Sequence, residues 1–199
     1  MTTPPSLLAR MSPVEPDDGD PALRLEELVR RSARRAPNKE ALRIGSLSVS
    51  YGELIGTAER WAAVLRTAHP AGTPQFIGVL CDRTLTGYTA VLAAMCAGAA
   101  VVPFTPDTPS GRLVRLLCDQ PLDALIVDEA GAAKAKDVAA RCSLPSLYAP
   151  ESDPTSLISG HVVPTGPEGP NGTAYVMFTS GSTGWPKAVP VTHASTCHF

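Results

Sequence analysis

Hydrophobic residues near the start of the chain recur with the period of an α-helix. Leu25, Leu28 and Val29 fall on one face of a helix predicted over residues 23–35. We expect the opposite face to carry ion pairs at i,i+4 spacing, Glu26–Arg30 and Glu27–Arg31.

A β-hairpin and a second helix are predicted next. Two short extended runs, Ala41–Ile44 and Leu47–Ser50, are separated by Gly45-Ser46, a spacing typical of a hairpin. Ser50 and Glu53 then form the pattern of a capping box, which predicts a helix start. We expect one buried stripe along this helix, made of Tyr51, Leu54, Ile55, Ala58, Trp61, Ala62 and Leu65.

After residue 74 the pattern changes to short, continuous apolar runs. Such runs are typical of strands covered on both faces. Three are predicted, and they alternate with helices of small or amphipathic residues; the first of these helices spans 85–97, and the second has Thr108 as N-cap and Pro109 in its first turn. The runs are Phe76–Leu80, Ala99–Val102 and Ala124–Val127. This alternation predicts an α/β layered fold, a mixed or parallel sheet with flanking helices.

Proline and glycine mark two segments without regular elements. Residues 1–21 are rich in proline and acidic residues and are predicted to be a flexible leader. Residues 149–172 are rich in proline and glycine and are predicted to form a long loop. We therefore divide the chain into a leader, 1–21, and one incomplete domain, 22–199.

Charge and composition exclude some classes of partner. A formal net charge of −2 and dispersed arginines favour neither nucleic acid nor an anionic membrane. The N-terminus lacks the apolar core of a signal peptide, and five widely spaced cysteines form no CxxC pair. We expect a cytoplasmic protein with reduced thiols.

The segment richest in chemistry follows a predicted strand, Thr173–Phe178. It combines hydroxyl side chains, two glycines and a lysine: Thr179, Ser180, Gly181, Ser182, Thr183, Gly184 and Lys187. Glycine lets backbone N–H groups approach an anion, hydroxyls add donors, and lysine adds positive charge. The segment is therefore predicted to bind a polyphosphate.

Two other kinds of phosphate loop do not fit this segment. A Walker A loop needs glycine before the lysine and a hydroxyl residue after it, where Pro186 and Ala188 stand here. A dinucleotide fingerprint needs a third glycine beside Gly181 and Gly184. The alternative of a low-complexity surface loop is disfavoured by the ordered placement after a strand.

Residues 175–189, with His193 six residues after Lys187, resemble the phosphate-binding motif of the adenylate-forming (AMP-binding) superfamily. Ala188 is the one departure, since glycine is commoner there. Three upstream segments also resemble family motifs, and the last is most similar to the amino-acid-activating branch used in nonribosomal peptide synthesis. They are Val49–Leu54, Met95–Pro103 and Pro106–Leu113.

The resemblance implies an ATP-dependent ligase that joins a carboxylic acid, here an amino acid, to AMP and releases pyrophosphate. The acyl group would pass to the phosphopantetheine arm of a carrier protein. Residues 179–184 and Lys187 would bind the terminal phosphates, with Lys187 as the catalytic cation. Ligands for Mg²⁺ and the acid-binding pocket would lie beyond residue 199, so we expect no turnover by this chain alone.

Two alternatives remain open. An acyl-CoA ligase of the same superfamily would differ in its acyl pocket and thiol acceptor. A non-catalytic truncated remnant would fold without activity. We assign no metal site, because His193 and Cys197 have helical i,i+4 spacing but no distant partner ligands, which makes a structural or surface role the better interpretation.

Overall fold

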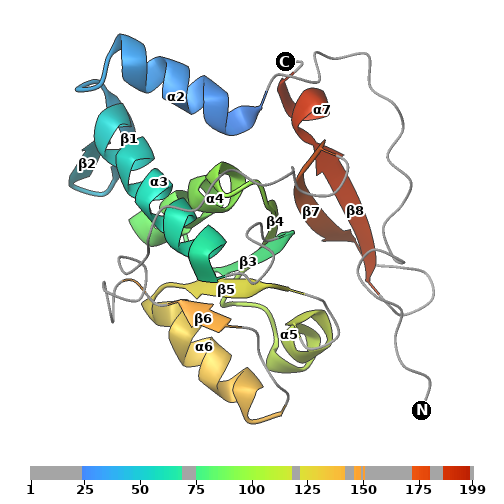
Figure 1. Ribbon diagram of the computed structural model, residues 1–199. Helices are drawn as coiled ribbons and strands as arrows, with labels where there is room; N and C mark the ends of the chain where they lie inside the picture. The colour runs from blue at the N-terminus through green and yellow to red at the C-terminus, as the bar shows by residue number, and fades with distance from the viewer. Residues whose placement is uncertain are drawn as a thin grey trace.

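The computed structural model describes residues 24–68, 75–117, 122–141, 146–148, 150, 172–179 and 186–197. Among these, six strands form one sheet in the order β6-β5-β3-β4-β7-β8 (Figure 1). The strands are β3 (Phe76–Leu80), β4 (Ala100–Phe104), β5 (Ala124–Val127), β6 (Ser146–Tyr148), β7 (Thr173–Thr179) and β8 (Lys187–Thr192).

The helices and a separate two-stranded hairpin complete the described structure. The hairpin consists of β1 (Glu40–Ile44) and β2 (Leu47–Ser50). The helices are α2 (Leu25–Arg35), α3 (Tyr51–Ala68), α4 (Leu85–Cys96), α5 (Ser110–Leu117), α6 (Glu129–Ala139) and α7 (His193–Cys197). No helix in the described ranges combines the length and apolar character needed to cross a bilayer.

The sheet is mixed, as the sequence predicted. Strands β6, β5, β3, β4 and β7 pair in parallel, and β8 pairs with β7 in the antiparallel direction. Neither β6 nor β8 was predicted. Pro190 lies within β8, which is tolerated because β8 is an edge strand and a missing N–H costs no ladder bond on its open side.

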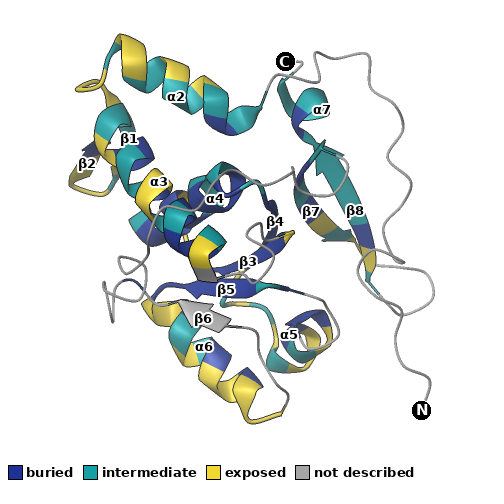
Figure 2. Cartoon of the chain, viewed as in Figure 1, coloured by how far each residue is buried: buried dark blue, intermediate teal, exposed yellow. Residues whose placement is uncertain are grey.

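Each central strand divides its side chains between two cores. Ile77 and Val79 of β3 pack with α3 and α4, whereas Phe76 and Leu80 pack on the other face with α5 and α6. Figure 2 shows these central strands as buried. Because successive side chains in a strand point to opposite faces, a strand covered on both faces must be apolar throughout. The continuous apolar runs in the sequence therefore correspond to the central strands.

The hairpin and the capping box are confirmed. Gly45 takes a positive φ of 57° in the β1–β2 turn, a conformation that glycine adopts without steric cost. The Ser50 N–H donates to Glu53 Oε2 at 2.9 Å, and the Glu53 N–H donates to Ser50 Oγ at 3.3 Å. Hydrogen bonds from the Ser50 side chain and backbone also lower the pKa of Glu53. Helix α3 thus begins where the sequence indicates.

Helix α2 differs from its prediction in which face it buries. The Glu27–Arg31 pair is present at 3.6 Å, but the predicted Glu26–Arg30 pair is wrong. Glu26 is buried and pairs with Arg24, while Leu28, expected in the core, is exposed. Helical periodicity did not reveal the reason, which is that the first turn of α2 packs against a polar residue of α7, His193.

Two other boundaries also moved. Helix α5 begins at Ser110, because the Thr108 hydroxyl bonds Thr105 Oγ1 at 3.1 Å instead of capping the helix. Strand β4 runs from Ala100 to Phe104 rather than starting at residue 99. The predicted leader lies outside the described residues, as does the predicted loop 149–172 apart from Pro150 and Gly172.

The close approach of α6 to β3 gives a test of the packing. A Cβ on Gly131 would lie 1.8 Å from the backbone oxygen of Leu80, whereas a Cβ on Gly111, on the exposed start of α5, meets nothing within 4 Å. We expect Gly131→Ala to lower the free energy of unfolding by about 3 kcal/mol in urea titrations followed by circular dichroism. Gly111→Ala should leave it unchanged or raise it by about 0.5 kcal/mol. Equal effects of the two substitutions would contradict this packing.

Candidate functional site

The described ends of the predicted phosphate loop meet as a strand pair. Thr179 is the last residue of β7, Lys187 is the first residue of β8, and the two are Cα partners in the ladder. Both side chains are exposed. Residues 180–186 therefore leave the sheet and return to it at one point, which brings a hydroxyl and an ammonium group to the base of the same loop.

The structure thus places two of the seven predicted site residues, Thr179 and Lys187. The other five lie outside the described residues: Ser180, Gly181, Ser182, Thr183 and Gly184.

A buried neighbour fixes which way Lys187 faces. Ala188 follows Lys187, pairs with Phe178 and is fully buried in the core shared with Val176. The ring of Phe178 stacks on Phe104 at the end of β4, with centroids 6.1 Å apart. Because side chains alternate along a strand, burial of Ala188 on one face directs Lys187 to the other. The motif's departure from glycine thus supplies a methyl group to the core.

The loop opens at the carboxyl end of the parallel strands. Strand β7 runs parallel to β4, and β4 runs parallel to β3. The carboxyl ends of β3, β4 and β7 therefore lie at the same edge of the sheet. In open α/β sheets, ligands bind at this edge, because the connecting loops there are free to vary around a rigid frame.

Asp128 is a polar residue at this edge that the sequence analysis did not single out. It is buried after β5 and caps α6, with Oδ1 accepting the Gly131 N–H at 2.8 Å. Its Oδ2 accepts the Asp82 N–H at 2.8 Å and the Thr84 hydroxyl at 3.0 Å. The signal in the sequence was an aspartate directly after a buried strand, three residues before a glycine. Asp128 joins the loops that follow β3 and β5 and makes the edge rigid.

The described thiols are poor nucleophiles. Burial raises the pKa of Cys96 to about 11, and burial, reinforced by the charge of Glu26, raises the pKa of Cys197. Cys81 is buried with Sγ 3.7 Å from the Ile126 carbonyl oxygen. Because the thiolate is the reactive form, these side chains stay protonated and inert near neutral pH.

His193 has a structural position rather than a metal-binding one. It is buried, with Nδ1 3.2 Å from the Leu25 nitrogen and 3.7 Å from Glu26 Oε2. Within the described parts of the chain, no group of three or more histidine, cysteine, aspartate or glutamate residues could hold a metal ion. Of the two roles the sequence left open for His193, the structure supports the structural one.

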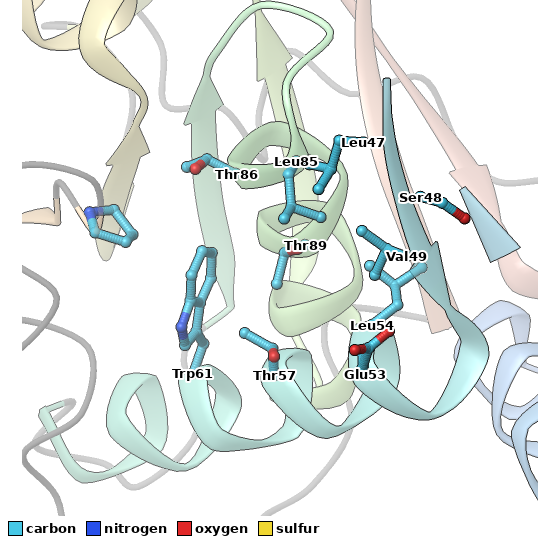
Figure 3. A pocket seen from close by; sticks show the side chains of 11 residues that line it. Leu47, Ser48, Val49, Glu53, Leu54, Thr57, Trp61, Leu85, Thr86 and Thr89 are labelled. Carbon is cyan, nitrogen blue, oxygen red and sulfur yellow. The ribbon is translucent and has the colours of Figure 1, made fainter. Parts of the chain in front are cut away.

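A separate cavity of about 470 Å³ lies between the β1–β2 hairpin, α3 and α4 (Figure 3). Glu53, Thr57 and Trp61 line it from one face of α3, and Leu85 and Thr89 line it from α4. Among its described lining residues the only charged group is the Glu53 carboxylate, which repels an anion. Neither Thr179 nor Lys187 lines this cavity, so it is distinct from the described base of the predicted phosphate loop.

Chemically, the described base of the loop can donate to an anion. Lys187 offers three N–H donors and a full positive charge, and Thr179 offers a rotatable hydroxyl. Both are exposed at a rigid edge, so a charged ligand could reach them at no cost of opening the core.

Comparison with known proteins agrees with this arrangement. The family model described as AMP-binding enzyme matches residues 29–199. A plipastatin synthase polypeptide of Bacillus subtilis (strain 168) is 34% identical over 181 residues, which are 88% of this chain and 6% of that protein. The chain therefore spans only a small part of the curated relatives it matches.

Solved structures agree on the fold. The AMPPNP-bound form of the nonribosomal peptide synthetase FmoA3 aligns with a TM-score of 0.67 and 28% identity, covering 90% of this chain and 18% of that chain. A Mycobacterium tuberculosis fatty acyl CoA synthetase aligns with a TM-score of 0.73 over 87% of this chain and 35% of that chain. Its 21% identity supports the fold alone. The protein belongs to the AMP-binding enzyme family of adenylate-forming ligases, and its relatives include nonribosomal peptide synthetases.

Proposed function

We propose that this chain provides the phosphate-binding part of an enzyme that activates an amino acid as its acyl-adenylate. The observation that carries the proposal is the ladder pair Thr179–Lys187, which closes a hydroxyl- and glycine-rich loop at the carboxyl edge of the sheet. Family membership supports ATP as the nucleotide. The resemblance of Pro106–Leu113 to the amino-acid-activating branch supports an amino acid as the acid.

In the proposed reaction, a carboxylate oxygen of the amino acid attacks the α-phosphorus of ATP. A new oxygen–phosphorus bond forms, the bond from the α-phosphorus to the bridging oxygen breaks, and pyrophosphate leaves with that oxygen. Both reactants are anions, so charge neutralisation and positioning must supply most of the catalysis. A second transfer would move the acyl group to the phosphopantetheine thiol of a carrier protein.

Each loop residue would have a defined role in this step. The hydroxyls of Thr179, Ser180, Ser182 and Thr183 and the backbone N–H groups of Gly181 and Gly184 would hold the β- and γ-phosphates. Lys187 would neutralise the charge that develops as pyrophosphate leaves, because a charge-assisted hydrogen bond is about twice as strong as a neutral one. Mg²⁺ would add further neutralisation, but the described residues supply no cluster that fits it, so we route no step through the metal.

An acyl-CoA ligase is the second candidate, favoured by the structural likeness to a fatty acyl CoA synthetase. It shares the adenylation step and differs in the acid and in the thiol. A third candidate is a folded remnant without activity. All three candidates keep the same loop geometry, so phosphate binding tests what they have in common, and turnover separates them.

The first test measures tripolyphosphate binding to the 199-residue chain by isothermal titration calorimetry at low ionic strength. We expect Lys187→Ala to weaken binding about tenfold, since one charge-assisted hydrogen bond contributes about 1.5 kcal/mol. Lys39→Ala is the matched control, because Lys39 is also an exposed lysine but lies before β1. A wild-type chain that does not bind, or equal losses in the two variants, would refute the phosphate site.

The second test is ATP–pyrophosphate exchange. We expect the 199-residue chain to show none with any amino acid, because the described cavity is separate from Thr179 and Lys187 and so places no acid beside the phosphates. A longer gene product that continues into the family's downstream motifs should exchange with an amino acid and not with a fatty acid. Exchange with fatty acids alone would favour the acyl-CoA ligase, and exchange by the short chain would overturn the division of labour proposed here.

A further inference from the structure

Helix α2 lacks a capping side chain of its own. Arg24 occupies the N-cap position in an extended conformation and makes no side-chain cap hydrogen bond. The first N–H groups of an α-helix have no partner within the helix, so they need acceptors from elsewhere. The first of them, the N–H of Leu25, donates to His193 Nδ1 at 3.2 Å, from a residue 168 positions away in sequence.

His193 is held firmly where it supplies this acceptor. It is only 3% exposed and is the first residue of α7, directly after β8. The turn behind it is capped locally, since Thr192 Oγ1 accepts the Ser195 N–H at 3.1 Å. The imidazole therefore links the first turn of α2 to the end of the strand that begins with Lys187.

Glu26 completes the junction. Its carboxylate is buried, with Oε1 accepting from Arg24 Nε at 2.5 Å. Its Oε2 has no hydrogen-bond partner and lies 3.7 Å from His193 Nδ1. Because Nδ1 accepts the Leu25 N–H, it carries no proton, and the neutral ring has its proton on Nε2. The geometry thus uses His193 as a neutral acceptor, with the anionic Glu26 near the positive end of the α2 dipole.

The β7–β8 ladder is irregular at this same end. The register shifts between Thr173 and Tyr175, opposite Thr192 and Val191. Strand β8 is an edge strand, so β7 is its only neighbour in the sheet. A slip of one residue would exchange the two faces of β8 and turn Lys187 toward the core in place of Ala188. Something beyond the ladder must hold the register.

We propose that His193 is a positioning residue that fixes the register of β8 by capping α2, and thereby holds Lys187 exposed at the base of the phosphate loop. Glu26 supports the imidazole in this role. The part that concerns phosphate binding rests on the function proposed above. The part that concerns register stands on the contacts of His193 alone.

The test combines two readouts on His193→Ala in the 199-residue chain. NMR cross-strand contacts between Phe178 and Ala188 report the register, and calorimetry with tripolyphosphate reports the site. We expect the substitution to remove the cross-strand contacts and to weaken tripolyphosphate binding about fivefold. His193→Asn, whose amide oxygen can accept the same N–H, should restore both.

Two further comparisons separate positioning from general stability. Asp123→Ala breaks bonds to the Gln75 and Phe76 N–H groups at the opposite edge, so it destabilises the fold without touching β8. It should leave register and binding unchanged. Leu25→Pro removes only the donated N–H, since proline is accepted at the first position of a helix and Arg24 is already extended. It should reproduce His193→Ala, whereas Leu25→Ala should not, and this pair serves if His193→Ala does not fold.

The outcomes are distinct. Intact cross-strand contacts in both His193→Ala and Leu25→Pro overturn the register role. Lost contacts with unchanged tripolyphosphate binding overturn the link to Lys187. A loss of binding in Asp123→Ala as large as that in His193→Ala shows a merely structural effect and also overturns the proposal. If Lys187→Ala itself leaves binding unchanged, the proposed function fails, while the cross-strand contacts still decide the register role.

Discussion

The antiparallel closure of β8 onto β7 is the interaction on which the candidate site depends. The ladder brings Thr179 and Lys187 opposite each other and places Ala188 in the core beside them. Burial of a small apolar side chain next to an exposed lysine gives the strand a definite inside and outside. A flexible loop gains a fixed base in this way, because its first and last residues are held by backbone hydrogen bonds and by the packing of Phe178 on Phe104.

The rest of the molecule supports this edge from two sides. The five parallel strands are apolar where they are covered by α3 and α4 on one face and by α5 and α6 on the other. Asp128 joins the loops after β3 and β5, so the edge is held by hydrogen bonds as well as by packing. At the far end of β8, the contact of His193 with Leu25 reaches across to the first helix. Function at the edge therefore draws on residues from nearly the whole length of the described chain.

Much of this fold could be predicted from the sequence because the relevant signals are local. The capping box at Ser50 and the apolar run Phe76–Leu80 each determine structure within a few residues. The polar junction of Glu26 with His193 could not be predicted, since it depends on a contact 168 residues apart. Strand β8 was missed because Pro190 breaks a strand pattern unless the strand is known to lie at an edge. For the candidate site, the motif predicted the residues, and the structure describes two of them, Thr179 and Lys187.

The most direct test of the central claim is paramagnetic relaxation by Mn²⁺·ATP bound to the ¹⁵N-labelled chain. The paramagnetic ion broadens amide signals close to the nucleotide's phosphates. The account predicts the strongest broadening at Thr179 and Lys187, with little at Thr57, Trp61 and Leu85 around the separate cavity. Broadening centred on the cavity, or spread evenly over the chain, would contradict it.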